Sequence, residues 1–192
     1  MTERPNLSNI TTLRERARKH IEGGAVIDEY KADRAMVIKL LDEALATEIV
    51  CSLRYKRHYF TAHGLASLSV AEEFLEHARQ EDQHAERFAA RICELGGAPN
   101  FSPHGLAERS HAEYVEGHTL MDMIREDLVA ERIAIESYRE IITYLGNDDP
   151  TTRRLFEDIL AVEEEHAEDL ASLTSRLGKE EHSRPSTPPV QG

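Results

Sequence analysis

The chain has 192 residues and a net charge of −13, enough length for one domain with a substantial core. This charge should repel nucleic acid and anionic lipid over most of the surface, although residues 13–19 (LRERARK) are basic. No apolar run approaches the roughly 20 residues of a membrane span, and the N-terminus lacks the apolar core of a signal peptide. We therefore expect a cytoplasmic protein without membrane contact. Its two cysteines, Cys51 and Cys93, are far apart in sequence and should be reduced thiols.

The composition favours helix, because Glu, Ala, Leu and Arg dominate and no segment alternates like a strand. Residues 1–32 are expected to form an N-terminal arm, in which Ser8 or Asn9 caps a short helix that runs to Glu22. Glycines then mark the ends of four long predicted helices, at about 33–63, 69–95, 118–145 and 150–178. The composition of residues 179–192 predicts a disordered tail.

Helices of this length are typical of a four-helix bundle. Short turns join the first helix to the second and the third to the fourth, so each pair should form an antiparallel hairpin. The connection between the hairpins, residues 97–117, has room for a short helix at GLAERS. About twenty extended residues reach about 66–72 Å, which exceeds the roughly 42 Å of a 28-residue helix. The sequence therefore predicts an all-α bundle, residues 33–178, of two helical hairpins joined by a long crossover.

Each predicted helix has a mostly apolar stripe at three- and four-residue spacing, and a glutamate interrupts every stripe near its middle. In the second and fourth helices a histidine follows the glutamate by three residues. The six residues are Glu48, Glu81, His84, Glu131, Glu163 and His166. Because they lie on faces that the bundle should bury, they are not ordinary solvated helix surface.

The four glutamates should lie at one height in the bundle. Glu48 and Glu81 are equally far from the turn at Gly64, and Glu131 and Glu163 are equally far from the turn GNDDP. Each lies about 16 residues from its turn, or roughly 24 Å along the helix. Four carboxylates buried together without cations would cost many kcal/mol. Two divalent ions would neutralise them, and this ligand set is the di-iron or di-manganese carboxylate pattern rather than a structural zinc site.

These motifs resemble the ferritin-like superfamily, and bacterioferritin most closely, over about residues 33–178. The resemblance is carried by the segments ALATEIVCSLRY, QEDQHA, EDLVAERIAIESY and EEEH. It implies two iron ions per subunit, or manganese, bridged by two glutamates, with one further glutamate and one histidine on each ion. The implied bridges are Glu81 and Glu163, the ligands of one ion Glu48 and His84, and those of the other Glu131 and His166.

The resemblance also bears on three further features. Tyr55 lies seven residues after Glu48, where bacterioferritins carry a tyrosine near the metals. The resemblance implies that Tyr55 donates an electron during oxidation, and core packing is the alternative role. Asp82 stands where bacterioferritins have the methionine that binds haem, so no such haem site is expected. The chain lacks their fifth helix, and its arm is more similar to Dps-like proteins, which form 12-subunit shells. A homo-oligomeric cage of 12 subunits is therefore favoured over one of 24.

The function implied by the resemblance is iron storage and detoxification: a ferroxidase oxidises Fe(II) with peroxide or oxygen, and the cage stores the Fe(III) mineral. One alternative is a di-iron or di-manganese peroxidase or oxygenase that stores nothing. Another is a DNA-compacting Dps-type protein, in which the basic arm contacts DNA. The acidic overall charge favours packing of the arm against a neighbouring subunit instead.

Two residues near the predicted metals remain open to more than one interpretation. His77 lies one turn before Glu81 on the same stripe and could support the metal ligands, line a path by which ions arrive, or be a buried histidine of the core. Cys51 lies three residues after Glu48 and is either close to the metals or a small buried hydrophobe.

Overall fold

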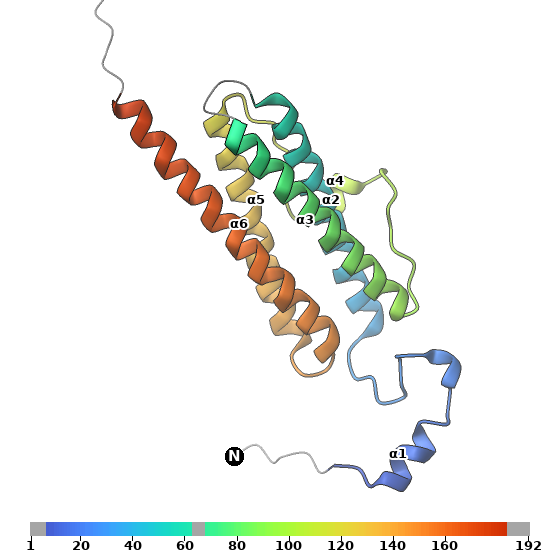
Figure 1. Cartoon of the computed structure of the whole chain (residues 1–192). Coiled ribbons are helices and arrows are strands. Elements are labelled where there is room, and N and C mark those ends of the chain that lie inside the picture. Colours follow the sequence, from blue (N-terminus) through green and yellow to red (C-terminus); the bar gives the residue numbers. More distant parts are fainter. Residues whose placement is uncertain (1–6, 63–67, 184–192) are drawn as a thin grey trace, which may run out of the picture.

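The computed structural model describes residues 7–62 and 68–183, with side chains through residue 179. Four long helices form a bundle with a small arm at one end, and the first and last of them run antiparallel to the two between (Figure 1). In chain order the elements are α1 (Ile10–Arg16), η1 (Ile21–Gly23), α2 (Arg34–Thr61), α3 (Leu68–Glu94), α4 (Leu106–Arg109), α5 (Leu120–Leu145) and α6 (Pro150–Ser183). The predicted all-α four-helix bundle is confirmed, and the described ranges contain no strand. Within those ranges, none of the helices has the length and apolarity needed to cross a membrane.

The two hairpins are α2 with α3 and α5 with α6, and the densest packing lies within each pair. The predicted short helix in the crossover is α4. Capping residues start the helices where the sequence suggests: Asp33 accepts from two backbone amides of α2, and Thr119 forms a capping box with Asp122 at α5. The turn between α2 and α3, with Gly64, lies outside the described residues.

The arm helix is shorter than predicted. Asn9 caps α1, as expected, but the helix ends at Arg16 rather than Glu22. It has no buried residue, and a helix this short is not stable without packing. The arm is fastened to the bundle at its other end, where the Tyr30 hydroxyl donates to Asp149 Oδ2 at 2.7 Å.

The last helix is longer than predicted. It passes through Gly178 and ends at Ser183, so the expected disordered tail from residue 179 is wrong for residues 179–183. A glycine within a helix costs about 1 kcal/mol relative to alanine. The Lys-Glu-Glu run that follows has high helix propensity and offsets this cost. Residues 184–192, the rest of the predicted tail, lie outside the described residues.

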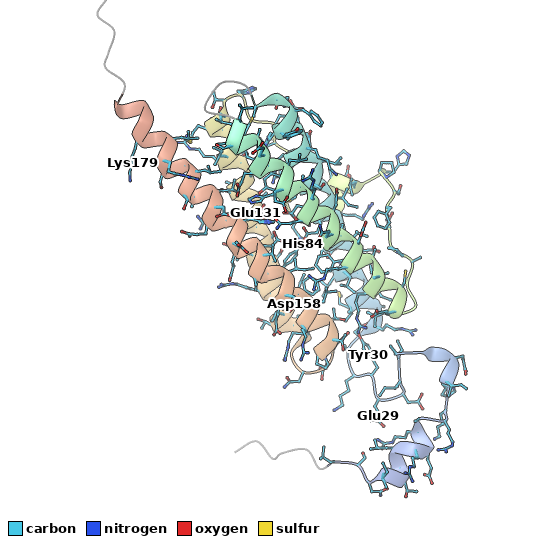
Figure 2. All side chains as sticks on the ribbon, in the orientation of Figure 1. Glu29, Tyr30, His84, Glu131, Asp158 and Lys179 are labelled. Atoms are coloured by element: carbon cyan, nitrogen blue, oxygen red, sulfur yellow. The ribbon has the colours of Figure 1, made fainter. Side chains whose placement is uncertain are left out.

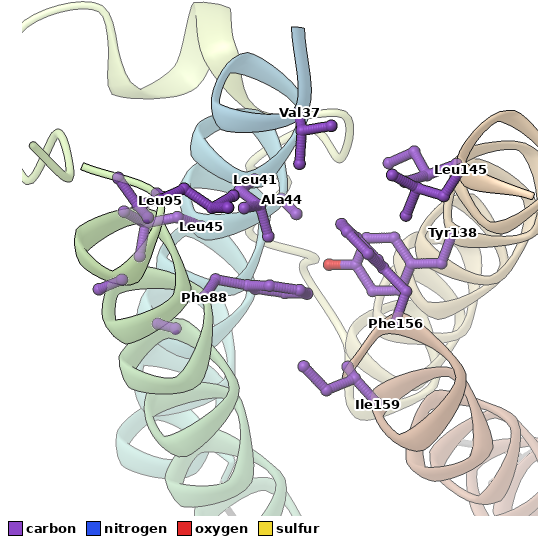
Figure 3. Close-up of a cluster of buried hydrophobic side chains, with 14 of the residues drawn as sticks. Val37, Leu41, Ala44, Leu45, Phe88, Leu95, Tyr138, Leu145, Phe156 and Ile159 are labelled. Carbon is purple, nitrogen blue, oxygen red and sulfur yellow. The ribbon is translucent and has the colours of Figure 1, made fainter. Parts of the chain in front are cut away.

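Two apolar clusters fill the bundle on either side of its middle. One is built around the rings of Phe88, Tyr138 and Phe156, with Leu41 and Leu45 of α2 packed against them (Figure 3). The other is built around Tyr55, Phe74, Ile124 and Leu170, toward the other end. Both clusters exclude water from the layer between them, and that layer contains the predicted metal ligands.

A buried ionic network fixes the crossover against the bundle. Arg54 Nε donates to Asp127 Oδ1 at 2.7 Å, and His58 Nδ1 lies 2.8 Å from the other oxygen of Asp127. Arg54 and His58 also donate to backbone carbonyls of the crossover, those of Glu113 and Glu116, at 2.9 and 2.8 Å. The side chains of Arg54, Asp127 and His58 are at most 1% exposed, so the buried charges of Arg54 and Asp127 depend on each other.

We expect Arg54→Met to lower the free energy of unfolding by about 3–5 kcal/mol, because Asp127 would remain buried without its cation. Chemical denaturation measures the change. Arg57→Met is the matched control: Arg57 lies on the same helix and pairs with Glu116 at the surface, so its loss should be much smaller. Equal losses in both variants would contradict the structural role assigned to Arg54.

Candidate metal centre

Six polar side chains converge from the four long helices at the middle of the bundle. They are Glu48 of α2, Glu81 and His84 of α3, Glu131 of α5, and Glu163 and His166 of α6. Each is at most 4% exposed. Glu131 and His84, which come from opposite hairpins, both lie at mid-height of the bundle in Figure 2. The structure thus brings together all six residues that the sequence selected.

The six residues form two overlapping groups of four, in which the ligand atoms lie within 4.8 Å of one another. Glu81 and Glu163 belong to both groups. Glu48 and His84 complete one, and Glu131 and His166 complete the other. This division is the one that the resemblance implies for two metal ions with two bridging carboxylates.

The three-residue spacing within α3 and α6 turns each histidine toward the shared glutamates. His84 Nδ1 lies 3.5 Å from Glu81 Oε2 of its own helix and 2.8 Å from Glu163 Oε1 of the opposite hairpin. His166 Nδ1 lies 3.4 Å from Glu163 Oε2 and 3.3 Å from Glu81 Oε1. The near-symmetry of these contacts follows from the repetition of one hairpin pattern in the chain.

Most of these converging atoms lack a hydrogen bond. Among the described residues, both carboxylate oxygens of Glu81 and of Glu163 are buried without a partner, as are the Nδ1 atoms of His84 and His166. The 2.8 Å approach between His84 and Glu163 does not have hydrogen-bond geometry. A buried polar atom left unpaired costs about 1–3 kcal/mol. Six such atoms facing one another fit a pair of divalent cations, which would accept their lone pairs.

Without metal, the centre retains protons. Burial raises the pKa of Glu48 to about 8, and the nearby Glu81 carboxylate adds to this effect. Burial and the charges of Glu81 and Glu163 hold the pKa of Glu131 well above its usual range. Burial acts to lower the pKa of His84, but contacts with Glu163 and two further carboxylates outweigh it and raise this pKa to about 12. Protons therefore occupy the lone pairs that a cation would use.

The profile of the ferritin-like domain matches residues 38–179, which include all six residues of the centre. The chain belongs to the ferritin-like family. A bacterioferritin from Desulfovibrio desulfuricans is 30% identical over 149 residues, which cover 76% of this chain and 79% of that protein. A nutrient stress-induced DNA-binding protein from Synechococcus sp. is 31% identical over 134 residues, 68% of this chain and 76% of the relative.

Solved structures agree with this assignment. A bacterioferritin-related protein from Bacteroides fragilis, described as a dodecameric thioferritin, is 30% identical with a TM-score of 0.77, and the match covers 81% of this chain and 94% of that chain. The bacterioferritin of D. desulfuricans, whose structure describes a diiron site, is 27% identical with a TM-score of 0.68. The match covers 76% of this chain and 82% of that chain. The expected resemblance to bacterioferritin and Dps-like proteins is confirmed.

Two buried tyrosines flank the centre of this ferritin-like chain. Tyr55 donates a hydrogen bond to Glu131, and Tyr138 donates one to Glu48. Tyr55 follows Glu48 by seven residues, and Tyr138 follows Glu131 by the same interval. Each tyrosine therefore orients the glutamate of the opposite hairpin. Tyr55 was predicted and Tyr138 was not, although its spacing after Glu131 repeats that of Tyr55 after Glu48.

The position of the bacterioferritin haem methionine is occupied by a polar cluster. Asp82 Oδ2 lies 2.6 Å from Lys56 Nζ, and the Ser52 hydroxyl donates to Asp82 Oδ1 at 2.6 Å. Both cysteines are free: Cys51 is buried, with Sγ 3.8 Å from Arg54, and Cys93 is exposed. Burial raises the pKa of the Cys51 thiol well above its usual range, which favours the interpretation as a small buried side chain.

We expect bound Mn(II) to raise the unfolding temperature more at pH 8 than at pH 5. In the metal-free protein the proton on Glu48, whose folded pKa is about 8, competes with the metal below that pH. Affinity should therefore grow by up to about tenfold per pH unit for each displaced proton. The raised pKa has the opposite effect on the metal-free fold, because ionisation of Glu48 removes stability as pH rises from its unfolded value of 4.5 toward 8.

Differential scanning calorimetry of metal-free and Mn(II)-loaded protein across this pH range measures both trends. In Glu48→Gln, which has no proton to lose at this position, the dependence of the metal effect on pH should be weaker. A metal effect that is equal at pH 5 and pH 8 would contradict the coupling of metal binding to these carboxyl groups.

Proposed function

We propose that this ferritin-like protein is a ferroxidase that oxidises Fe(II) at the six-residue centre and stores the Fe(III) product in a homo-oligomeric cage. Its bacterioferritin and Dps-like relatives support a role in iron storage. The observation that carries the ferroxidase proposal is the convergence at the middle of the bundle of two carboxylates, Glu81 and Glu163, and two imidazole nitrogens, all buried and without hydrogen bonds.

Two Fe(II) ions are the substrates of the proposed reaction. Each ion loses one electron, and one molecule of hydrogen peroxide accepts both electrons and two protons to form two water molecules; oxygen is the alternative oxidant. Two ions held side by side can reduce the oxidant by two electrons together, which avoids the release of radicals. The four glutamates would offset the four positive charges of the ion pair, and both imidazoles would bind as neutral ligands.

Neighbouring residues prepare the ligands for this role. Gln80 Oε1 lies 2.6 Å from His166 Nε2 and can accept a hydrogen bond from its N–H group, which leaves the lone pair of His166 on Nδ1, facing Glu81 and Glu163. The hydroxyls of Tyr55 and Tyr138 hold Glu131 and Glu48 in position. Tyr55 is also the proposed electron donor to the centre when oxygen is the oxidant, because reduction of oxygen to water takes more than the two electrons of the iron pair; Tyr55 would supply one of the additional electrons and pass its phenolic proton to Glu131.

The proposed cage has 12 subunits, as the related thioferritin of B. fragilis is described. The N-terminal arm exposes apolar side chains that a neighbouring subunit would cover, namely Leu7, Ile10, Leu13, Ile21 and Ile27. Particle mass and iron content, measured together after addition of Fe(II) and peroxide, test this part of the proposal. A cage would have many times the subunit mass and retain far more than two irons per subunit; a small particle with about two would indicate a non-storage di-iron enzyme.

A DNA-binding function is the second candidate, because one relative is named a DNA-binding protein. The basic side chains of the arm would carry it, although Arg16 pairs with Glu29 at 3.3 Å. Retardation of DNA in a gel at physiological salt, lost on removal of residues 1–32, would support this function. The overall charge of −13 leads us to expect no retardation.

We expect Glu81→Ala and His166→Ala each to slow Fe(II) oxidation by about 100-fold or more, because each removes a direct ligand of the centre. Stopped-flow absorbance after mixing with Fe(II) and oxidant measures the rate, and size-exclusion chromatography checks that the particle is unchanged. Glu165→Ala, an exposed glutamate on α6, is the control and should retain the full rate. Undiminished oxidation in both ligand variants would overturn the proposed centre.

A further inference from the structure

A third group of potential metal ligands lies beside the dinuclear centre, outside the six residues already described. It consists of Glu73 and His77 of α3 and Asp169 of α6, whose ligand atoms lie within 4.8 Å of one another. His77 Nε2 is 3.6 Å from Glu73 Oε1 and 4.0 Å from Asp169 Oδ2. Both distances exceed a hydrogen bond, so the imidazole faces the two carboxylates without being bonded to either.

The hydrogen bonds on the other side of the His77 ring determine which nitrogen carries the lone pair. Tyr55 has one hydroxyl proton and donates it to Glu131. The oxygen of Tyr55 can therefore only accept from His77 Nδ1, which lies 3.3 Å away. In the neutral ring this leaves the lone pair on Nε2, directed toward Glu73 and Asp169. His77 is 2% exposed, so this unbonded ligand atom belongs to an almost fully buried side chain.

Among the described residues the two carboxylates form no close ion pair with a lysine or arginine, although the positive charge of Arg176 lies near enough to Glu73 to act on its carboxylate. The ion-pair contact of each carboxylate is with His77. Both side chains are partly open to solvent, at 41% and 48% exposure, whereas His77 is closed in behind them. The group is thus arranged from solvent inward, with two carboxylates outside and one imidazole inside.

The group also adjoins the dinuclear centre directly. The ring of His77 stacks on the ring of His166, with 4.0 Å between centroids and 20° between planes. His166 belongs to the ligand group of Glu131. An ion held by Glu73, His77 and Asp169 would therefore lie between solvent and this half of the dinuclear centre.

Comparison of the two hairpins shows that this arrangement is not a by-product of the repeated pattern. In α3, His77 lies four residues before Glu81 and Glu73 lies eight residues before it. In α6, the positions four and eight residues before Glu163 are Ile159 and Leu155. Ile159 is fully buried in the apolar cluster around Phe88 and Phe156. Among the described residues, one side of an otherwise duplicated centre thus carries this extra group of potential ligands, whereas on the other side Ile159 is packed in an apolar cluster and the position that matches Asp169 holds Arg87.

We propose that Glu73, His77 and Asp169 bind a third divalent cation, which in the working protein is Fe(II) waiting to enter the dinuclear centre beside His166. The identity of the ion as iron rests on the proposed function. The existence of the site does not, because it follows from the three side chains alone. Two carboxylates and one neutral imidazole are suitable ligands for Fe(II), Mn(II) and Co(II) alike.

The test is equilibrium dialysis of the full-length assembled protein against Co(II) without oxygen, with bound cobalt counted per subunit. Wild type should bind three ions. The double variant Glu73→Gln/Asp169→Asn, which alters partly exposed side chains, should bind one ion fewer. The control Glu72→Gln/Glu168→Gln removes the same charge from exposed positions of the same helices and should match wild type. Equal binding by the two double variants would overturn the third site.

A further variant separates this proposal from the proposed function. In Glu81→Ala the dinuclear centre should lose its ions while the ion at Glu73, His77 and Asp169 remains. If wild type bound one ion that the Glu73→Gln/Asp169→Asn variant lost, the third site would stand and the dinuclear centre would fall. If the third site delivers iron, the Glu73→Gln/Asp169→Asn variant should also need several-fold more Fe(II) for half-maximal oxidation, with an unchanged maximal rate.

Discussion

The arrangement of this protein depends on four carboxylates buried at one level of an apolar bundle. Glu48, Glu81, Glu131 and Glu163 are each about 1% exposed, with aromatic and aliphatic clusters on either side. Four negative charges in this position are not stable by themselves, and without metal they retain protons or pair with protonated histidine. A pair of divalent cations would resolve the conflict, so the same residues that weaken the metal-free fold are the ones proposed to bind metal.

The duplicated hairpin explains the symmetry of the centre. The positions at which the two hairpins differ explain why polar residues lead to the centre from one side. Each hairpin supplies one glutamate, one Glu-x-x-His pair and one tyrosine, and each tyrosine bonds to the glutamate of the other hairpin. On the side of His166 the repeat is broken by the buried His77 and by Glu73 and Asp169, which are partly exposed to solvent. On the opposite side Ile159 and Phe88 close the bundle. A symmetric site thereby gains one polar approach.

Most of the fold and the grouping of the six central residues could be predicted from the sequence, because helix periodicity and equal distances from two turns are local properties. The prediction of a stop at Gly178 failed because one glycine is a weak signal against a following run of helix-forming residues. The network of Arg54, His58 and Asp127 was not predicted, since it depends on how the crossover lies against two helices. Tyr138 was missed because an aromatic residue on an apolar stripe also fits ordinary core packing, and only its seven-residue interval after Glu131, which repeats that of Tyr55 after Glu48, distinguishes it.

The most direct test of the account is the anomalous diffraction of crystals soaked in Fe(II) without oxygen, collected at the iron absorption edge. We expect two strong peaks in the middle of the bundle, both between Glu81 and Glu163, one beside His84 Nδ1 and the other beside His166 Nδ1. An iron-soaked crystal with no anomalous density between these side chains, and with the glutamates turned toward water or bonded to one another, would contradict it.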